Sequence, residues 1–438
     1  MRARLLFLFH VLLVMPLFSQ EIKKGDNYSY ARRIVDTLAS PAMHGRGYVN
    51  GGDSLAASYI RSEFKKLNLK SFTGEYYQKL SFRVNTFPYV QAFYWSKVGE
   101  LQIGKDYIIA PSSGTAGMFS PMSTVEWLDS VTFYTPKKLD KFLKKSHRYS
   151  FIAIDVPGRR DDQFIALFIK AKISIRGLIF IKRNKLTADF EQHEDPFPSV
   201  QLLLHDHITI ENLKKSSYAD IVFTNKMIAD HPSQNVIGYV EGSEHPDSFI
   251  VFSAHYDHIG EMGKALFPGA NDNASGCAML LSLAKHYAMP EHKPKCSVVF
   301  MAFCGEEVGL LGSKYYTEHP LFPLKNIKFL LNMDIMGTGE DGITAVNGSV
   351  YTKQFEKLKQ LNTENKFIKE VYIRGKAANS DHYFFSEQGV KAFFIYTMGG
   401  IKAYHDIYDK AETLPLNEFE NLFKLIVKFG DYLQATSY

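Results

Sequence analysis

The residues of this chain best suited to chemistry are histidines and carboxylates that stand where short apolar runs end or expected helices begin. They are His255, Asp257, Asp272, Glu306, Glu307 and Asp334, and His405, near the C-terminus, is a further candidate. Imidazoles and carboxylates form a hard-to-borderline ligand set, which suits zinc and related divalent ions. Open α/β sheets place their active sites at the ends of their strands, so residues in these positions are expected to meet. The pattern therefore predicts a catalytic metal site.

The number of candidate ligands indicates two metal ions rather than one. Two histidines and three carboxylates exceed the ligand set of a single tetrahedral zinc, and they fit two ions about 3.5–4 Å apart that share one carboxylate. Glu306 and Glu307 are adjacent, so one of them is expected to bind metal and the other to act as a general base. Asp257 lies two residues beyond His255 on the same side of an extended chain, where it can accept the second N–H of the imidazole.

Alternating strands and helices from residue 235 onward are expected to position these residues. Apolar runs predict strands at 248–254, 297–303, 327–333 and 391–396. Helical spacing of apolar residues predicts helices at about 273–288, 310–318 and 416–434. Strands that alternate with helices are typical of the α/β class with a mostly parallel central sheet.

The first half of the chain changes in character near residue 98. Helices are expected at 29–39 and 53–67, and alternating aromatic sequence from Tyr76 to Tyr94 predicts strands. Between about 98 and 230, short strands and polar turns surround one helix near 163–171, which indicates a smaller inserted α+β domain. The predicted organisation is a signal peptide at 1–19, an N-terminal part of the catalytic domain at 20–97, the inserted domain at 98–231 and the rest of the catalytic domain at 232–438.

The N-terminus has the layout of a secretory signal peptide. Arg2 and Arg4 precede an apolar stretch from Leu5 to Phe18, which ends at Ser19 and is too short to span a bilayer comfortably. A retained N-terminal anchor is the alternative interpretation. The expected protein is exported to the periplasm or the extracellular space and has no stable membrane insertion after the signal is removed.

Charge and cysteine content argue against a nucleic-acid-binding protein and against a fold held together by disulfides. Removal of the signal takes two arginines from a formal net charge of +5 and leaves +3, without a basic run, so nucleic acid is not an expected partner. The three cysteines, Cys277, Cys296 and Cys304, do not make a disulfide framework. Their apolar surroundings indicate inert, buried thiols.

Several segments, in the right order, resemble the co-catalytic zinc aminopeptidases of metallopeptidase family 28, which also contains glutamate carboxypeptidase and transferrin-receptor relatives. The matching segments are Ser253-Ala-His-Tyr-Asp257, Gly269-Ala-Asn-Asp-Asn-Ala-Ser-Gly276, Phe303-Cys-Gly-Glu-Glu307, Asn332-Met-Asp-Ile-Met-Gly337, Ser380-Asp-His382 and Tyr404-His-Asp-Ile-Tyr-Asp409. Together they cover the region from about 235 to 438. The loop Gly45-Arg46-Gly47 and the helix at 53–67 resemble the N-terminal portion of the family. The resemblance implies a three-layer sandwich around the mostly parallel sheet.

Carried over position by position, the resemblance implies two zinc ions per chain. His255 and Asp334 would hold one ion, Glu307 and His405 would hold the other, and Asp272 would bridge both. The peptide bond between Asp272 and Asn273 is expected to be cis.

The resemblance also implies roles for residues beside the ligands. Glu306 would be the general base, Asp257 the partner of His255, and Tyr404 a phenol that steadies the tetrahedral intermediate. Ser380-Asp381-His382 is interpreted as support for the ligands. The region 98–231 resembles a protease-associated domain. His258 and the segment Leu204-His205-Asp206-His207 look like metal motifs, and both are interpreted as lying outside the metal site.

The function that the resemblance implies is a di-zinc aminopeptidase, in which a hydroxide that bridges the metals attacks the peptide bond and Glu306 moves the proton. Its partners would be peptides with a free N-terminus. A glutaminyl cyclase shares the fold and most ligands but uses one zinc, and a carboxypeptidase is a second enzymatic alternative. A binding protein that has lost catalysis is the alternative from another class; its hallmark would be missing ligands, and here none is missing.

Overall fold

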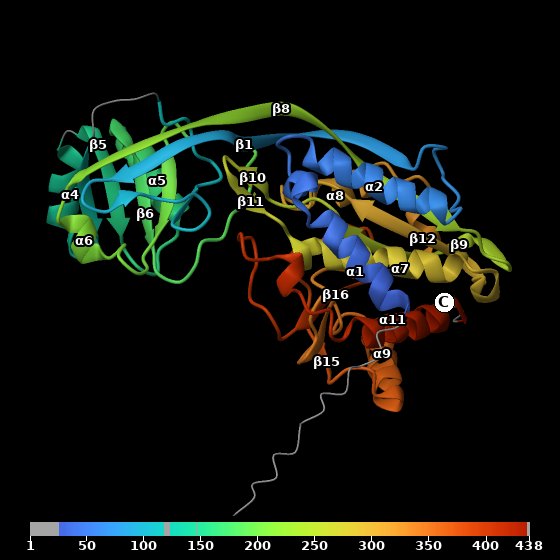
Figure 1. Ribbon diagram of the computed structural model, residues 1–438. Coiled ribbons are helices and arrows are strands. Elements are labelled where there is room, and N and C mark those ends of the chain that lie inside the picture. Colours follow the sequence, from blue (N-terminus) through green and yellow to red (C-terminus); the bar gives the residue numbers. More distant parts are fainter. Residues whose placement is uncertain (1–25, 118–122, 146, 436–438) are drawn as a thin grey trace, which may run out of the picture.

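The computed structural model describes residues 26–117, 123–145 and 147–435, and the expected signal peptide lies outside these ranges. A larger part carries most of the helices, and a smaller part lies at the far end of two long strands, β1 (Tyr77–Trp95) and β8 (Tyr218–Val240) (Figure 1). These two strands are antiparallel along their length, and they join both parts into one continuous sheet.

The sheet of the larger part is mostly parallel. Its strands are β9 (His245–His255), β12 (Cys296–Phe303), β13 (Ile327–Met333), β14 (Gly342–Val346), β15 (Val371–Ile373) and β16 (Ala392–Met398). β9 lies between β12 and β13 and is parallel to both, and β13 is parallel to β16. β14 is antiparallel to β16, and β12 is antiparallel to β8. The predicted α/β class with a mostly parallel central sheet is confirmed.

Helices cover both faces of this sheet and make three layers. Successive residues of β9 point to opposite faces: Ile250 and Phe252 belong to one apolar cluster, and Val251 belongs to another. The first cluster is completed by α1 (Asp26–Leu38), α2 (Gly52–Lys66), α7 (Gly276–Ala288), α9 (Thr352–Asn365) and α11 (Phe419–Ala435). The second is completed by α8 (Leu311–Glu318) and α10 (His382–Glu387).

The smaller part continues the sheet beyond β8. Its strands are β3 (Tyr107–Ile109), β4 (Ser123–Asp129), β5 (His147–Asp155), β6 (Ile175–Lys182) and β7 (Ser199–Leu203), and its helices are α3 (Ser130–Tyr134), α4 (Pro136–Lys144), α5 (Asp161–Ala171) and α6 (Ile210–Lys214). β4 to β7 are parallel neighbours, and β3 closes the edge antiparallel to β7. The continuous β8 passes through residue 231, so the domain boundary placed there stays a prediction.

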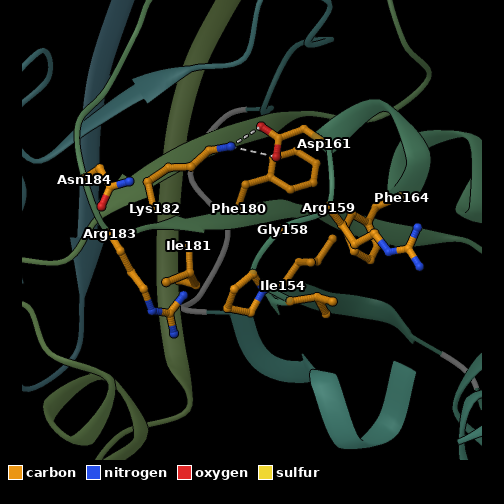
Figure 2. Close-up of a pocket in the computed structure, with 12 residues that line it drawn as sticks. Ile154, Gly158, Arg159, Asp161, Phe164, Phe180, Ile181, Lys182, Arg183 and Asn184 are labelled. Atoms are coloured by element: carbon orange, nitrogen blue, oxygen red, sulfur yellow. Dashed lines mark hydrogen bonds and ion pairs between the residues drawn. The ribbon is translucent and has the colours of Figure 1, made fainter. Parts of the chain in front are cut away.

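A cleft of about 250 Å³ opens in the smaller part where β5 and β6 end and α5 begins (Figure 2). Lys182 crosses it to contact both carboxylate oxygens of Asp161, at 2.7 and 2.8 Å. Asp161 also accepts a hydrogen bond from Gln201. Because its one lining carboxylate is already occupied in this way, the cleft offers no free acid for chemistry.

The segment before α7 departs from regular helix. Residues 270–275 form a π-type turn, and α7 starts at Gly276 rather than near residue 273. The peptide bond between Asp272 and Asn273 is cis, so that prediction is confirmed. A short hairpin of β10 (Gly260–Met262) and β11 (Ala265–Phe267) lies between β9 and this turn.

Within the described ranges, no helix combines the length and the apolar character needed to cross a membrane.

Candidate metal centre

The carboxyl ends of parallel strands meet at one edge of the sheet, and the predicted residues gather there. His255 ends β9, Glu306 and Glu307 follow β12, and Asp334 follows β13. Asp272 comes from the turn before α7, and His405 from the loop between β16 and α11. The structure therefore brings together all the residues that the sequence analysis assigned to the two ions.

The candidate ligand atoms form two groups that share Asp272. In the first, Nε2 of His255 lies 3.5 Å from Oδ1 of Asp272 and 3.4 Å from Oδ1 of Asp334. In the second, Nε2 of His405 lies 3.1 Å from Oδ2 of Asp272 and 3.0 Å from Oε2 of Glu307. Ligand atoms at the corners of a tetrahedral zinc site, with bonds of about 2.0–2.1 Å, are separated by about 3.3 Å. Both groups fit a zinc ion, and each receives one oxygen of Asp272.

Two atoms of the first group lack partners although they are buried. Nε2 of His255 and Oδ1 of Asp334 accept or donate no hydrogen bond within the part of the chain that the structure describes. A buried polar atom without a partner costs free energy, so most such atoms in native proteins are satisfied by protein, water or an ion. These two atoms without hydrogen-bond partners belong to the same group whose distances fit a zinc ion.

The carboxylates of the centre raise the pKa of both of its histidines. Burial alone would lower the pKa of His405, but the carboxylates of Glu307 and Asp272 outweigh it and raise that pKa well above its ordinary value. The pKa of His255 is likewise raised against the effect of burial, by Glu306 and Asp334. A cluster that draws protons onto its histidines also favours a divalent cation in their place.

Asp257 lies behind the two glutamates. Its carboxylate accepts the backbone N–H of Glu306 at 3.3 Å and of Glu307 at 3.2 Å, and the hydroxyl of Tyr48 at 2.5 Å. Its Oδ1 lies 3.7 Å from Nδ1 of His255, whose shorter contact, 3.2 Å, is to the backbone carbonyl of Asp257. The carboxylate therefore joins the segment after β9 to the segment after β12.

Tyr404 lies against the ligand loop. Its ring stacks on the ring of His405, with centroids 4.0 Å apart and planes 14° from parallel, and 42 % of the residue is exposed. Burial of the phenol and the neighbouring carboxylates raise its pKa above the ordinary value, so the hydroxyl keeps its proton. It can donate a hydrogen bond at the mouth of the centre.

The segment Ser380-Asp381-His382 is buried beside Asp334. The hydroxyl of Ser380 accepts a hydrogen bond from Asn332 at 2.7 Å and lies 3.4 Å from Oδ2 of Asp334. Burial raises the pKa of Asp381 to about 7. These contacts agree with the supporting role that the resemblance implies.

Three groups that hold the centre were not singled out as site residues from the sequence. Asp409 accepts the backbone N–H of Asn271 at 2.8 Å and of Asp272 at 2.9 Å. The carbonyl oxygen of Ala188, in the smaller part, lies 2.8 Å from Nδ1 of His405. The third is Arg46, whose buried guanidinium donates to the carbonyl of Asp272 at 3.1 Å. Asp409 and Arg46 stand in segments that resemble the family, which was the available signal, whereas nothing marks Ala188.

Two histidine segments that the sequence analysis set aside differ in the structure. His205 lies in the smaller part, where its Nε2 is 2.9 Å from Asp106, and it joins neither ligand group. His258 instead is fully buried together with Asp272, Glu307 and His405, and these four residues form a group that could hold a metal ion. Its Nδ1 lies 2.7 Å from Oε1 of Glu307, so the expectation that His258 lies outside the site is wrong.

Comparison with known proteins finds a family match in the second half of the chain. Residues 235–430 match the model of peptidase family M28. A probable zinc metalloprotease of Pyrenophora teres f. teres is 40 % identical over 116 residues, which are 25 % of this chain and 24 % of the relative. Aminopeptidase YwaD of Bacillus subtilis is 32 % identical over 169 residues, 36 % of this chain and 34 % of the relative. The alignments thus span about a quarter to a third of the length of these relatives.

Solved structures agree on the fold of nearly the whole chain. A zinc aminopeptidase from Bacillus subtilis superposes with a TM-score of 0.69 and 19 % identity, covering 92 % of this chain and 94 % of the other. A peptidase M28 precursor from Shewanella amazonensis gives a TM-score of 0.66 and 15 % identity, covering 94 % and 97 %. At these identities the structural likeness shows the fold alone. Residues 235–430 of the chain are thus similar to peptidase family M28.

Proposed function

We propose that the protein is a di-zinc aminopeptidase that releases residues from the free N-terminus of peptides. The observation that carries the proposal is the pair of ligand groups that share the two oxygens of Asp272. Zinc is supported by the family and by the mixed nitrogen and oxygen donors. The names of two relatives, aminopeptidase YwaD and the Bacillus subtilis zinc aminopeptidase, support N-terminal cleavage.

In this proposal His255 and Asp334 hold one zinc, Glu307 and His405 hold the other, and Asp272 bridges them. The bound metals would supply Lewis acidity, which polarises the scissile carbonyl and lowers the pKa of water. Asp257 fixes the two glutamates through their backbone N–H groups, so their side chains enter the centre from a rigid segment.

Glu306 would take the proton of the attacking water and pass it to the leaving amine. The side chain of Glu306 lies close to His255 and Asp334, the two residues that would hold the first zinc. Burial, and then the charges of Glu307 and Asp381, raise its pKa well above the ordinary value for a glutamate. A carboxyl tuned upward is suited to accept and release a proton near neutral pH. Tyr404 would donate a hydrogen bond to the oxygen that becomes negative in the tetrahedral intermediate.

The proposal extends to place and organisation. The expected signal peptide at 1–19 would direct the protein to the periplasm or the extracellular space. Residues 98–231 would be a protease-associated-like insertion within a peptidase domain formed by 20–97 and 232–438.

One experiment separates this function from its alternatives. Protein lacking residues 1–19 is analysed for zinc and assayed on aminoacyl amides, on N-blocked peptides and on a peptide with N-terminal glutamine. We expect about two zinc ions per chain and cleavage of free N-termini only. One zinc with release of a cyclised product would identify a glutaminyl cyclase. Cleavage of N-blocked peptides from the C-terminus would identify a carboxypeptidase, and zinc binding without turnover a binding protein.

A further inference from the structure

His258 is a buried histidine that lies within the second group of possible ligands, where it touches Glu307, and the five proposed ligands leave it another role. Its side chain has no solvent exposure, and its Nδ1 lies 2.7 Å from Oε1 of Glu307. A carboxylate ligand only accepts hydrogen bonds, so Nδ1 must carry the proton of this contact. Within the described residues, Nε2 of the same ring has no hydrogen-bond partner.

The two carboxylate oxygens of Glu307 have different partners. Oε1 is occupied by the N–H of His258, while Oε2 lies 3.0 Å from Nε2 of His405, inside the second ligand group. A carboxylate held at one oxygen can present only the other to a metal, and it cannot rotate away when the metal leaves. Hydrogen bonds of this kind to ligating carboxylates are known to tune metal affinity.

His258 is held in place through both its backbone and its ring. Its backbone N–H donates to the carbonyl of Arg46 at 3.3 Å, and its ring meets the ring of His405 edge-on, with centroids 5.5 Å apart. Gly269 approaches so closely that a Cβ built there would lie 2.4 Å from the imidazole carbon Cδ2. A ring confined in this way can deliver its N–H to one place only.

The neighbouring glutamate lacks such a restraint. Asp257 binds the backbone N–H groups of Glu306 and Glu307 alike, at 3.3 and 3.2 Å, so the backbone does not distinguish them. The side-chain bond from His258 reaches Glu307 alone among the two. Asp257 thus fixes the backbone of the segment, and the adjacent His258 fixes the side chain of Glu307, the proposed ligand.

We propose that His258 is a positioning residue for Glu307 and that its Nδ1–H sets the affinity of the zinc site formed by Asp272, Glu307 and His405. The inference rests on the proposed function, because it takes this group as one of two zinc sites.

Two substitutions test the position of the donor rather than its presence. His258→Asn places an amide near the position of Nδ1, and His258→Gln places it near the position of Nε2. Zinc affinity of each site is measured by competition with a chelator. We expect one of the two sites to weaken about 10–100-fold in the glutamine variant, and both sites to keep affinities within about threefold of wild type in the asparagine variant. His286→Gln is the matched control, because His286 stacks on His292 on the outer end of α7, away from the ligands.

The outcomes separate this inference from the proposed function. Wild-type protein with two zinc ions, together with unchanged or equally weakened second sites in both variants, would overturn the role of His258 and leave the function standing. Weakening of both zinc sites to the same degree in the glutamine variant would also overturn it, because the bond reaches only one site. Wild-type protein that binds fewer than two zinc ions would overturn both. Thermal unfolding of the metal-free variants is expected to match that of His286→Gln, which would show that the weaker affinity does not come from misfolding.

Discussion

At the scale of single residues, Glu306 and Glu307 show how adjacent carboxylates acquire different roles. Burial would raise the pKa of Glu307, but His405 and His258 outweigh it and hold that pKa well below its ordinary value. For Glu306, burial and the charge of Glu307 act together and raise the pKa. Two carboxyl groups pushed in opposite directions suit a ligand that stays ionised and an acid or base that exchanges a proton.

The contrast predicts the result of Glu306→Gln. The amide keeps the size of the side chain but cannot accept the proton, so we expect turnover to fall by a factor of about 10²–10⁴ or more. Zinc content should stay at the wild-type value, since the ligands are untouched. Steady-state kinetics and metal analysis on the same sample check both expectations. A variant with wild-type turnover would remove Glu306 from the mechanism, and one that loses zinc would identify it as a ligand.

The cysteines give a second prediction at this scale. All three thiols are free and buried. Burial raises the pKa of Cys277 to about 12 and that of Cys304 well above its ordinary value, so thiolate is scarce at pH 8. We expect no thiol to react with a disulfide reagent in the folded protein and three to react in denaturant. Fast reaction of one thiol in native buffer would contradict the buried positions.

At the scale of elements, the sequence predicted the strands and helices that have a clear pattern of apolar residues. β12 is buried throughout, β13 is buried at all but one residue, and β9 is buried from Phe249 to His255. The bounds of these strands differ from the expected ones by three residues or fewer. β14, α9 and β15 were not predicted. α9 carries few apolar residues toward the core, chiefly Phe355 and Leu358, so its period is weak.

The long strand β1 was predicted only as several strands, for a physical reason. Pro88 lies within it, and proline removes a hydrogen-bond donor and normally ends a strand. The structure accommodates it at an irregularity: the pairing with β8 shifts register between Thr86 and Tyr89. Such a bulge depends on the partner strand, more than a hundred residues away, which local sequence does not reveal.

The turn before α7 depends on a buried cation. The guanidinium of Arg46 has no solvent exposure and donates to five carbonyl oxygens. They belong to Leu38, Tyr256, Pro268, Gly269 and Asp272, at 2.9, 2.8, 2.7, 2.7 and 3.1 Å. One of these acceptors, Asp272, lies in the turn, and Pro268 and Gly269 directly precede it, so Arg46 helps to define the shape of this segment.

We therefore expect Arg46→Lys to destabilise the protein despite the conserved charge. A lysine offers one nitrogen, so at least two carbonyls would lose their donor, and each unsatisfied buried acceptor costs about 1–3 kcal/mol. The expected loss in unfolding free energy is about 3 kcal/mol or more, measured by urea denaturation of the metal-free protein. Arg61→Lys, on a half-exposed side chain of α2, is the control and should change stability by less than about 1 kcal/mol. Equal effects of the two changes would contradict the role assigned to Arg46.

At the scale of the whole molecule, the smaller part contacts the candidate metal centre directly. The backbone of Ala188 pairs with His405 in both directions: its N–H donates to the carbonyl of His405 at 2.9 Å, and its carbonyl accepts from Nδ1 at 2.8 Å. Lys185 donates to the carbonyl of Tyr404 at 3.0 Å and lies over its ring. The loop that carries His405 is therefore held by the smaller part as well as by the larger part to which it belongs. No spacing rule could have predicted this, because the contact joins backbone atoms 217 residues apart.

This coupling predicts that a change in the smaller part weakens zinc binding in the larger one. Ala188→Pro removes the N–H that binds the carbonyl of His405 and restricts the preceding residue, so the carbonyl that orients the imidazole should move. Loss of an orienting partner of a metal-bound histidine lowers metal affinity about 10–100-fold. We expect that loss at the site of His405 and none at the site of His255, measured by chelator competition.

Ala188→Gly is the matched control, because it changes the side chain at the same position and keeps both backbone hydrogen bonds; its zinc affinities should stay within about threefold of wild type. If the proline variant bound both ions as wild type does, the smaller part would be only an attachment to the peptidase. If it lost affinity at one site, the two parts would share a single metal centre, with the ligand His405 oriented by a residue outside the part that carries it.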